Sequence, residues 1–211
     1  MLLHDYFRSS AAYRVRIALN LKRLAYDRHD IMLLKNEQRT PEHLARNPQG
    51  FVPALEVEGK VITQSLAIID WLDARHPEPR LIPADPDARA AVLAQALVIG
   101  ADTHPLNNLR VMRYLAHELA VEQDKRDDWS RHWMAEGFTA LEALTADLPG
   151  PFLGGEVPNL ADIYLVPQLF NARRFAMDLS AWPRLLRADT AAAGQEAFAA
   201  AHPDRVAPAD A

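Results

Sequence analysis

The chain has 211 residues, of which 49% are hydrophobic and 24% are charged, and its formal net charge at pH 7 is −5. This composition is typical of a folded globular protein and excludes an intrinsically disordered chain. The negative charge gives no reason to expect nucleic acid or an anionic membrane as a partner, so an anionic ligand would have to meet a local basic cluster. Cysteine is absent, which excludes disulfides, thiolate metal sites and a protein thiol nucleophile.

The hydropathy of the chain favours a cytoplasmic location. Residues 1–5 show neither the basic segment nor the apolar core of a signal peptide. No stretch approaches the roughly 18 apolar residues that are needed to cross a bilayer. Because the chain has no cysteine, any reaction that uses a thiol needs one that arrives on a ligand.

The first eighty residues alternate between strand-like and helix-like patterns, which predicts an α/β unit. Glu58-Gly59-Lys60 lies between two short apolar runs and predicts a hairpin with glycine at its tip. In chain order the patterns predict a strand at 2–6, a helix at 11–24, a strand at 26–33, a short helix, hairpin strands at 54–57 and 61–63, and a helix at 65–75.

The pattern changes after a proline-rich stretch. Four prolines between residues 76 and 87 interrupt regular structure, which predicts an interdomain linker. Beyond it the chain is all-helical, with helices at 88–101, at 108–119 after a break at His104-Pro105, and along an apolar stripe from 129 to 148. We therefore expect an α+β protein with one domain at 1–80, a linker at 81–87 and a second domain at 88–211. The residues from His202 onward are expected to form an untethered tail.

Asn159-Leu160-Ala161-Asp162 predicts the start of a buried helix. Asn159 is a good N-cap, and a carboxylate three residues later can bond the cap's own N–H, as in a capping box. We expect this motif to serve folding and not catalysis.

Arg8-Ser9-Ser10 lies between the first strand and the first helix, and it has two interpretations. One serine caps the helix. Alternatively, the free N–H groups and partial positive charge of the helix N-terminus stabilise an anion, and a serine hydroxyl donates to a thiolate and lowers the pKa of the thiol.

Two further polar positions in the first unit remain open between structural and functional roles. Pro53 can open a strand or follow a cis peptide bond. Ser65 can cap the helix that follows it, or Gln64 and Ser65 can hold a ligand carboxylate at that helix N-terminus. Two helix starts in one small unit favour a polyanionic ligand.

The second part of the chain holds another polar concentration at residues 104–110. His104 is either a helix-surface histidine or a functional one, and Arg173-Arg174 is either a solvated face or part of a site. The basic residues Arg8, Arg110 and Arg174 can form one anion-binding site only if the fold brings them together. The histidines have no metal-ligand spacing, so we expect no metal site. There is no glycine-rich phosphate loop, so we expect no nucleotide chemistry.

Residues 6–19, Tyr-Phe-Arg-Ser-Ser-Ala-Ala-Tyr-Arg-Val-Arg-Ile-Ala-Leu, closely resemble the opening signature of the zeta-class glutathione transferases. The similarity covers nearly the whole chain. Its further motifs are Asn47-Pro48, Val52-Pro53-Ala54-Leu55, Gln64-Ser65-Leu66-Ala67-Ile68-Ile69, Leu81-Ile82-Pro83, His104-Pro105-Leu106-Asn107-Asn108, Asn159-Leu160-Ala161-Asp162, Leu165-Val166-Pro167-Gln168 and Ala172-Arg173-Arg174-Phe175.

The resemblance implies a thioredoxin-like first domain, an all-helical second domain, a homodimer and glutathione as cofactor. Val52 would pair its backbone with the cysteinyl unit ahead of a cis Pro53, and Gln64 and Ser65 would hold the γ-glutamyl end. The implied glutathione contacts are Ser9, Ser10, Ala11, Gln38, Val52, Gln64, Ser65, His104, Asn108, Leu109 and Arg110. The residues implied for the carboxylates of a small dicarboxylate substrate are Arg8, His104, Arg110 and Arg174.

Ala11 departs from the pattern of many zeta members, which have cysteine after the two serines. A role for that thiol is therefore in doubt here, while the serines remain in place. Isomerases of the bacterial branch include some without this cysteine, so Ala11 is compatible with isomerase activity.

The activity that the resemblance implies is glutathione-dependent cis–trans isomerisation of a maleyl diketo acid, with Ser9, Ser10 and Arg8 as catalytic residues. Two alternatives stay open: a general glutathione transferase acting on small electrophiles or haloacids, and a non-enzymatic binding protein with the same fold. A thiol-dependent reductase is disfavoured because no cysteine can form the mixed disulfide. The sequence does not select between maleylacetoacetate and maleylpyruvate.

Overall fold

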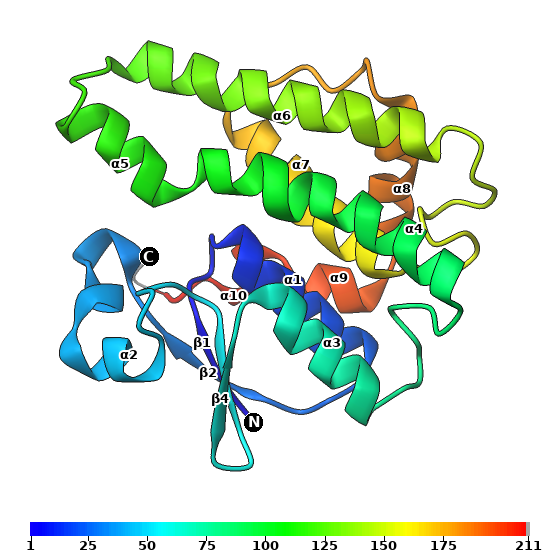
Figure 1. Ribbon diagram of the computed structural model, residues 1–211, viewed down its shortest axis with the longest axis horizontal. Coiled ribbons are helices and arrows are strands. Elements are labelled where there is room, and N and C mark those ends of the chain that lie inside the picture. Colours follow the sequence, from blue (N-terminus) through cyan, green and yellow to red (C-terminus); the bar gives the residue numbers. More distant parts are fainter. Residues whose placement is uncertain (210–211) are drawn as a thin grey trace. The chain divides into compact units, whose positions relative to one another are not determined.

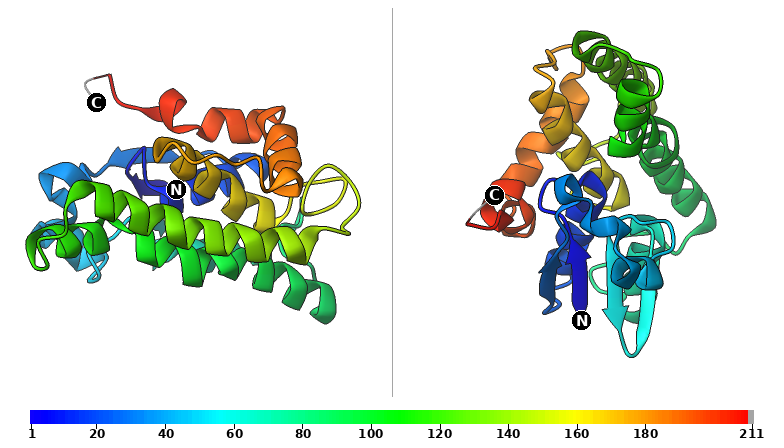
Figure 2. Two further views of the ribbon diagram at one scale, coloured as in Figure 1. Left: turned by 90° about the horizontal axis from the view of Figure 1, so that it is seen from above. Right: turned by 90° about the vertical axis from the view of Figure 1, so that its left-hand side faces the viewer.

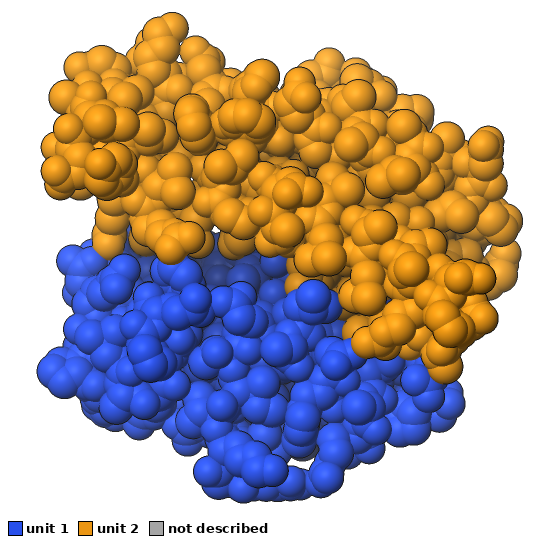
Figure 3. Space-filling view, in the orientation of Figure 1, with its two compact units in different colours: residues 1–81, 193–211 blue, residues 82–192 orange. Residues whose placement is uncertain are grey.

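The computed structural model describes residues 1–209 and divides the chain into two compact units (Figure 3). The first unit joins residues 1–81 to the C-terminal segment that begins at residue 193. The second unit consists of residues 82–192.

The first unit is built on a four-stranded mixed sheet with the strand order β2-β1-β3-β4. The pairing of β1 with β2 is parallel, and the pairings of β1 with β3 and of β3 with β4 are antiparallel. Leu3 lies opposite both Arg28 and Leu55, which fixes the register of the three strands. The strands are β1 (Leu2–Asp5), β2 (Asp27–Asp30), β3 (Ala54–Val57) and β4 (Lys60–Thr63).

The predicted hairpin is confirmed between β3 and β4. Its two loop residues, Glu58 and Gly59, have φ values of 50° and 73°. Two successive positive φ values are what a tight two-residue hairpin turn requires, and glycine adopts this conformation at the lowest cost.

Helices cover both faces of this sheet, as in a thioredoxin-like fold. Figures 1 and 2 show α1 and α3 on one face and α2 on the other. Helix α1 packs against both α3 and the C-terminal helix α9. The helices of the unit are α1 (Ser10–Leu21), η1 (Leu33–Lys35), η2 (Glu37–Arg39), α2 (Pro41–Arg46), α3 (Ser65–Arg75), α9 (Glu196–Ala201) and α10 (Pro203–Val206). Ile68, Ile69 and Leu72 of α3, which share one face of that helix, are fully buried.

The second unit is helical, as predicted. Its first helix continues without a gap through a π-helical and a 3-10 segment, so His104-Pro105 marks a change of helix type. The expected break lies instead at Asn108, whose backbone is extended. The helices are α4 (Pro86–Leu97), η3 (Val98–Thr103), η4 (His104–Asn107), α5 (Leu109–His117), α6 (Gln123–Thr145), α7 (Leu160–Arg174) and α8 (Pro183–Ala193). Within the unit, α4 packs against α7, and α6 packs against η3 and η4.

The capping box at the start of α7 is confirmed. The Ala161 N–H donates to Asn159 Oδ1 at 2.8 Å, and the Asn159 N–H donates to Asp162 Oδ2 at 2.9 Å. Asp162 also accepts the N–H groups of Leu153 and Gly154 at 2.7 and 3.0 Å. The carboxylate therefore anchors the preceding loop as well as the helix.

The expectation of an untethered tail from His202 onward is wrong for residues 202–206. His202 caps α10, which consists of Pro203–Val206, and the Val206 carbonyl accepts a hydrogen bond from Arg28 at 2.8 Å. The sequence gives no sign of this anchor because the two partners lie 178 residues apart. Residues 210 and 211 lie outside the described part of the chain.

The division into units also differs from the expected domains at two points. The segment from residue 193 on belongs to the first unit, whereas we expected it in a domain spanning 88–211. Helix α4 begins at Pro86, inside the expected linker at 81–87, because proline is favoured in the first turn of a helix. No helix among residues 1–209 is long and apolar enough to span a membrane.

Candidate functional site

The turn from Tyr6 to Ser9 connects β1 to α1 and places a hydroxyl group at the helix start. The Ser9 N–H donates to the Tyr6 carbonyl at 2.8 Å, which closes the turn. Ser9 has extended backbone angles, and its Oγ accepts the Ala12 N–H at 3.2 Å, so Ser9 is the N-cap of α1. Capping occupies the oxygen as an acceptor and leaves the hydroxyl hydrogen available to a ligand. Both interpretations of this serine are therefore compatible in one geometry.

Ser10 and Ala11 form the first turn of α1. Ser10 is the first helical residue and is buried, whereas Ala11 is half-buried. The first N–H groups of a helix have no partner inside the helix and carry a partial positive charge. This turn therefore favours a negatively charged atom beside Ser9.

Arg8 adds a full positive charge to the same turn. Its side chain is exposed, and its guanidinium lies 4.9 Å from the centroid of the Phe7 ring. This cation–π contact holds the charge near the turn while leaving it accessible to an anionic substrate.

Val52 presents an unpaired peptide group next to this turn. The Val52–Pro53 peptide bond is cis, as the resemblance implied. The Val52 side chain is buried in one cluster with Tyr6, Phe7 and Ile31, so it packs against the residues that lead to Ser9. Among residues 1–209, no hydrogen bond is made by the N–H or C=O of Val52. A ligand with its own peptide backbone can satisfy both groups.

Gln38, in η2, supplies a second unpaired polar group. Its side chain is 6% exposed, and its Oε1 is buried without a hydrogen-bond partner in the described chain. A Cβ added to Gly50 would lie 3.0 Å from the Gln38 carbonyl, and Gly50 has a φ of +64°. Glycine at this position therefore lets the Gln38 loop approach the segment that leads to Val52.

Gln64 and Ser65 lie where β4 ends and α3 begins. Gln64 occupies the N-cap position with a φ of 70°, makes no capping bond and donates instead to Gln49 Oε1 at 2.7 Å. The interpretation of Ser65 as the cap is wrong: Ser65 is the first helical residue, and its Oγ lies 3.5 Å from Nη1 of Arg14. The strained backbone of Gln64 turns the chain so that its own side chain, and not that of Ser65, lies beside the loop at Gln49.

Gln49 is a residue that the sequence reasoning missed. It precedes Gly50 in the turn after Asn47-Pro48, and its amide N–H donates to Asn47 Oδ1 at 3.2 Å. The sequence signal that could have identified Gln49 is the Asn-Pro-Gln-Gly turn, since such turns place polar side chains at the surface.

The first-unit candidates therefore lie close together, while those of the second unit lie on three elements: η4, the start of α5 and the end of α7. Contacts connect the Ser9 turn to Val52, the Gln38 loop to Gly50, and Gln64 to Gln49. In the second unit, His104 begins η4, and Asn108 caps α5 by accepting the Arg110 N–H at 3.0 Å. Leu109 is half-buried and Arg110 is exposed. Arg174 is exposed in the last turn of α7.

The first-unit geometry fits glutathione, a thiol-containing peptide with two carboxylates. The unpaired Val52 peptide group matches a peptide backbone, the buried Gln38 oxygen lacks a donor, and the N-termini of α1 and α3 favour negative charge. The Ser9 hydroxyl is placed to donate to a thiolate, and the exposed Arg8 guanidinium suits a carboxylate.

Comparisons with known proteins agree with this arrangement. Residues 3–80 match the glutathione S-transferase N-terminal domain, and residues 127–194 match the glutathione S-transferase C-terminal domain. The chain is 45% identical over 206 residues to a maleylacetoacetate isomerase of Pseudomonas aeruginosa, which covers 96% of each chain.

Two solved structures are similar over almost the full length. One is a holo structure of maleyl pyruvate isomerase, described as a bacterial zeta-class glutathione S-transferase, with a TM-score of 0.96, 41% identity, and coverage of 98% of this chain and 99% of that one. The other is maleylacetoacetate isomerase from Anaeromyxobacter dehalogenans with glutathione bound in the active site, with a TM-score of 0.88, 45% identity, and coverage of 99% and 97%.

Proposed function

The chain belongs to the zeta class of the glutathione S-transferase family, and on this premise we propose that it is a glutathione-dependent cis–trans isomerase of a maleyl diketo acid. The substrate is maleylacetoacetate or maleylpyruvate, and the product is the fumaryl isomer. The observation that carries the proposal is the Ser9 hydroxyl at the N-terminus of α1, beside the unpaired Val52 peptide group, in a chain without cysteine.

The proposed glutathione site lies mainly on the first unit. Val52 pairs with the cysteinyl backbone, and Gln64 and Ser65 hold the γ-glutamyl carboxylate. Gln38 contributes its buried amide. The remaining proposed contacts are Ser10, Ala11, His104, Asn108, Leu109 and Arg110.

Ser9 sets the charge state of the thiol. Bound glutathione supplies the thiolate that adds to the cis double bond and leaves again once the resulting single bond has rotated. The Ser9 hydroxyl donates to that sulfur, and the N–H groups of the first turn of α1 stabilise the same negative charge. Both effects favour the thiolate over the thiol, so the nucleophile is present at neutral pH.

Basic side chains hold the substrate. A desolvated arginine–carboxylate contact contributes roughly 1.5–3 kcal/mol, which is enough to orient a dicarboxylate. We assign Arg8, Arg110, Arg174 and His104 to the substrate carboxylates and to the charge that develops on the substrate carbonyl oxygen.

We further propose that the protein is a homodimer and that it acts in the cytoplasm. Membership of the glutathione S-transferase family supports the homodimer. The reaction needs reduced glutathione, and the cytosolic glutathione pool is kept reduced, which supports the location.

The test follows both the substrate isomer and the thiol. The protein is incubated with glutathione and either maleylpyruvate or maleylacetoacetate, and the fumaryl product and the free thiol are measured over time. An isomerase forms product while the thiol concentration stays constant, because glutathione is released in every turnover.

The same measurement separates the alternatives. A general transferase consumes one thiol for each electrophile converted, and a binding protein forms no product. Comparison of the turnover of the two substrates identifies the better one. Conversion that consumes glutathione stoichiometrically would contradict the proposal.

A further inference from the structure

Two arginine side chains fasten the C-terminal segment of residues 196–206 to the first unit, and we call this segment the C-terminal strap. Arg16 of α1 donates from Nε to the Ala201 carbonyl at 3.0 Å. Arg28 of β2 donates from Nη1 to the Val206 carbonyl at 2.8 Å. The strap is thus fixed at the end of α9 and again at the end of α10.

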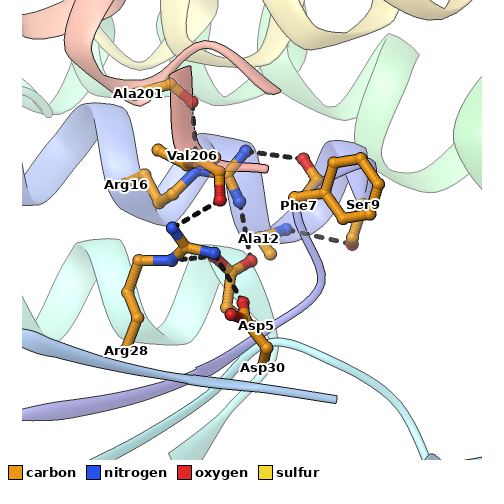
Figure 4. A network of polar contacts seen from close by, with 9 residues as sticks. All are labelled: Asp5, Phe7, Ser9, Ala12, Arg16, Arg28, Asp30, Ala201 and Val206. Atoms are coloured by element: carbon orange, nitrogen blue, oxygen red, sulfur yellow. Dashed lines mark hydrogen bonds and ion pairs between the residues drawn. The ribbon is translucent and has the colours of Figure 1, made fainter. Parts of the chain in front are cut away.

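Asp5 joins these two arginines. Its Oδ1 accepts from Arg16 Nη1 at 2.6 Å, and its Oδ2 accepts from Arg28 Nε at 2.8 Å (Figure 4). The side chains of Asp5 and Arg16 are 0% exposed. Burial lowers the pKa of the Arg16 guanidinium, and the adjacent Asp5 carboxylate acts in the opposite direction. A fully buried pair of this kind depends strongly on its geometry, because the charges have no water to compensate them.

The third nitrogen of Arg16 reaches the turn that carries Ser9. Nη2 donates to the Phe7 carbonyl at 3.0 Å, and the next carbonyl toward the N-terminus, that of Tyr6, accepts the Ser9 N–H. Figure 4 shows the Arg16 guanidinium bonded to the Phe7 carbonyl, with Ser9 at the end of the same turn. One side chain therefore connects the strap, the end of β1 and the Ser9 turn.

The strap also contacts the second part of the proposed thiol site. Val206 packs against the buried cluster of Tyr6, Phe7, Ile31 and Val52. The strap thus supports both the turn that carries Ser9 and the residue that presents the unpaired peptide group.

We propose that Arg16 and Asp5 are positioning residues that use the C-terminal strap to set the distance between the Ser9 hydroxyl and the thiol of glutathione bound at Val52. This inference rests on the proposed function of Ser9 and Val52. The strength of a hydrogen bond falls steeply with misalignment, so a small shift of the turn weakens the bond to the thiolate more than the bond to the thiol. The strap therefore tunes the pKa of the bound thiol without touching it.

Arg16→Lys tests the proposal because lysine keeps the positive charge and loses the planar fork that reaches three segments. The pKa of bound glutathione is measured by titrating the ultraviolet absorbance of its thiolate. We expect the thiol pKa to rise by about one unit in Arg16→Lys, which corresponds to about tenfold less thiolate at a pH below that pKa.

Arg184→Lys is the matched control. Arg184 is a buried arginine of the second unit that bonds three carbonyls, those of Thr145, Pro151 and Phe152, at 3.3, 3.2 and 2.5 Å. Its replacement removes the same kind of fork and lowers stability, as a urea titration of both variants would show. We expect no change in the thiol pKa from this variant.

Arg28→Gln is a second variant that tests the same proposal if Arg16→Lys does not fold. The Arg28 side chain is 21% exposed, and its loss releases Val206 while the bond between Arg16 and Asp5 remains. We expect a smaller rise of the thiol pKa, in the same direction.

The outcomes distinguish this inference from the proposed function. An unchanged thiol pKa in folded Arg16→Lys, or in Arg28→Gln where only that variant folds, overturns the positioning role, and so does an equal shift in Arg184→Lys. Ser9→Ala is titrated in parallel. If Ser9→Ala shifts the thiol pKa and the arginine variants do not, only the positioning role fails; if Ser9→Ala has no effect, the proposed function of Ser9 fails as well.

Discussion

At the residue scale, a single hydroxyl group serves both the fold and the proposed chemistry. Ser9 Oγ accepts the Ala12 N–H as the cap of α1, and its hydrogen remains available to the ligand. A helix cap is worth about 1 kcal/mol. A donor to the reacting anion is worth more, because it acts where charge has to be stabilised.

We expect Ser9→Ala to lower the free energy of unfolding by about 1 kcal/mol and to lower turnover about a hundredfold. Urea unfolding and isomerisation rates measure the two effects separately. Asp85→Ala is the control: Asp85 caps α4 by accepting the Ala88 N–H at 2.9 Å and has no proposed part in the reaction. It should show the stability loss with unchanged turnover. Equal turnover in Ser9→Ala and the parent protein would remove Ser9 from the mechanism.

His4 makes the first unit sensitive to acid. Its side chain is 0% exposed, and burial lowers its pKa below the usual 6.5, although the hydrogen bond that Glu56 Oε1 accepts from His4 Nε2 at 2.8 Å opposes this shift. The unfolded chain therefore takes up this proton more readily than the folded protein does. Stability should fall as the pH decreases below about 6.5.

Urea unfolding midpoints between about pH 8 and about pH 5 test this expectation. His4→Gln should remove most of the pH dependence in that window, because glutamine does not titrate. Glu56 acts in a lower window: its pKa lies below 4.5, chiefly because of the hydrogen bond with His4, so the stability that it contributes is lost only as the pH falls further. A parent protein with a flat profile down to about pH 5 would contradict the role of His4.

Residue-scale predictions from the sequence succeed where the cause is local. Asn159 and one serine of the Ser9-Ser10 pair were expected as caps. The observed caps are Asn159 and Ser9, because a short polar side chain before a helix bonds the next free N–H. By the same local rule, Ser65 looked equally suitable as the cap of α3. The positive φ of Gln64, which follows from how β4 meets α3, moves the cap position back by one residue.

At the scale of elements, close approach of α6 to η3 depends on Gly137. A Cβ at this position would overlap with the Oγ1 atom of Thr103, whose hydroxyl donates to the Val98 carbonyl at 2.8 Å. Thr103 is 2% exposed, so it has little room to move. Glycine is used here for contact between helices, and no unusual backbone conformation is involved.

Gly137→Ala should therefore lower the free energy of unfolding by about 1–3 kcal/mol through overpacking. Thr103→Ala removes the atom that would clash, so the double variant should recover part of the loss, as a double-mutant cycle of urea unfolding would show. A Gly137→Ala variant as stable as the parent protein would contradict this packing.

The sequence predicts most helices and strands to within a few residues, because their apolar spacing is a local property. Helix α3 was predicted at its observed bounds. The strand expected at 26–33 is shorter, Asp27–Asp30, because the last residue of the expected range, Leu33, begins η1. The C-terminal helices were missed because what orders them is contact with Arg16 and Arg28, which is visible only in the fold.

At the scale of the whole molecule, the chain returns to its first unit at its C-terminal end. The buried pair of Asp5 and Arg16 links the end of β1 to Ala201, which is 185 residues from Arg16. The first segment of this unit stops at residue 81, within the proline-rich stretch. No local pattern indicates that residues 193 onward belong to it, because the interaction involves buried charges and carbonyl groups far apart in sequence.

The homodimer is a further prediction at this scale. Sedimentation equilibrium should give a mass of twice the 23.6 kDa of the chain. The mass should be independent of glutathione, because the proposed site lies mainly within one chain. A monomer at micromolar concentration would contradict the prediction.

In the proposed reaction the only thiol is that of glutathione. The direct measurement is the rate of cis–trans isomerisation as a function of glutathione concentration, on protein first treated with a thiol-alkylating reagent and then freed of it. Because the chain has no cysteine, the treatment should leave the rate unchanged, and the rate should extrapolate to zero without glutathione and saturate as glutathione binds. Full isomerisation in the absence of glutathione would contradict the account.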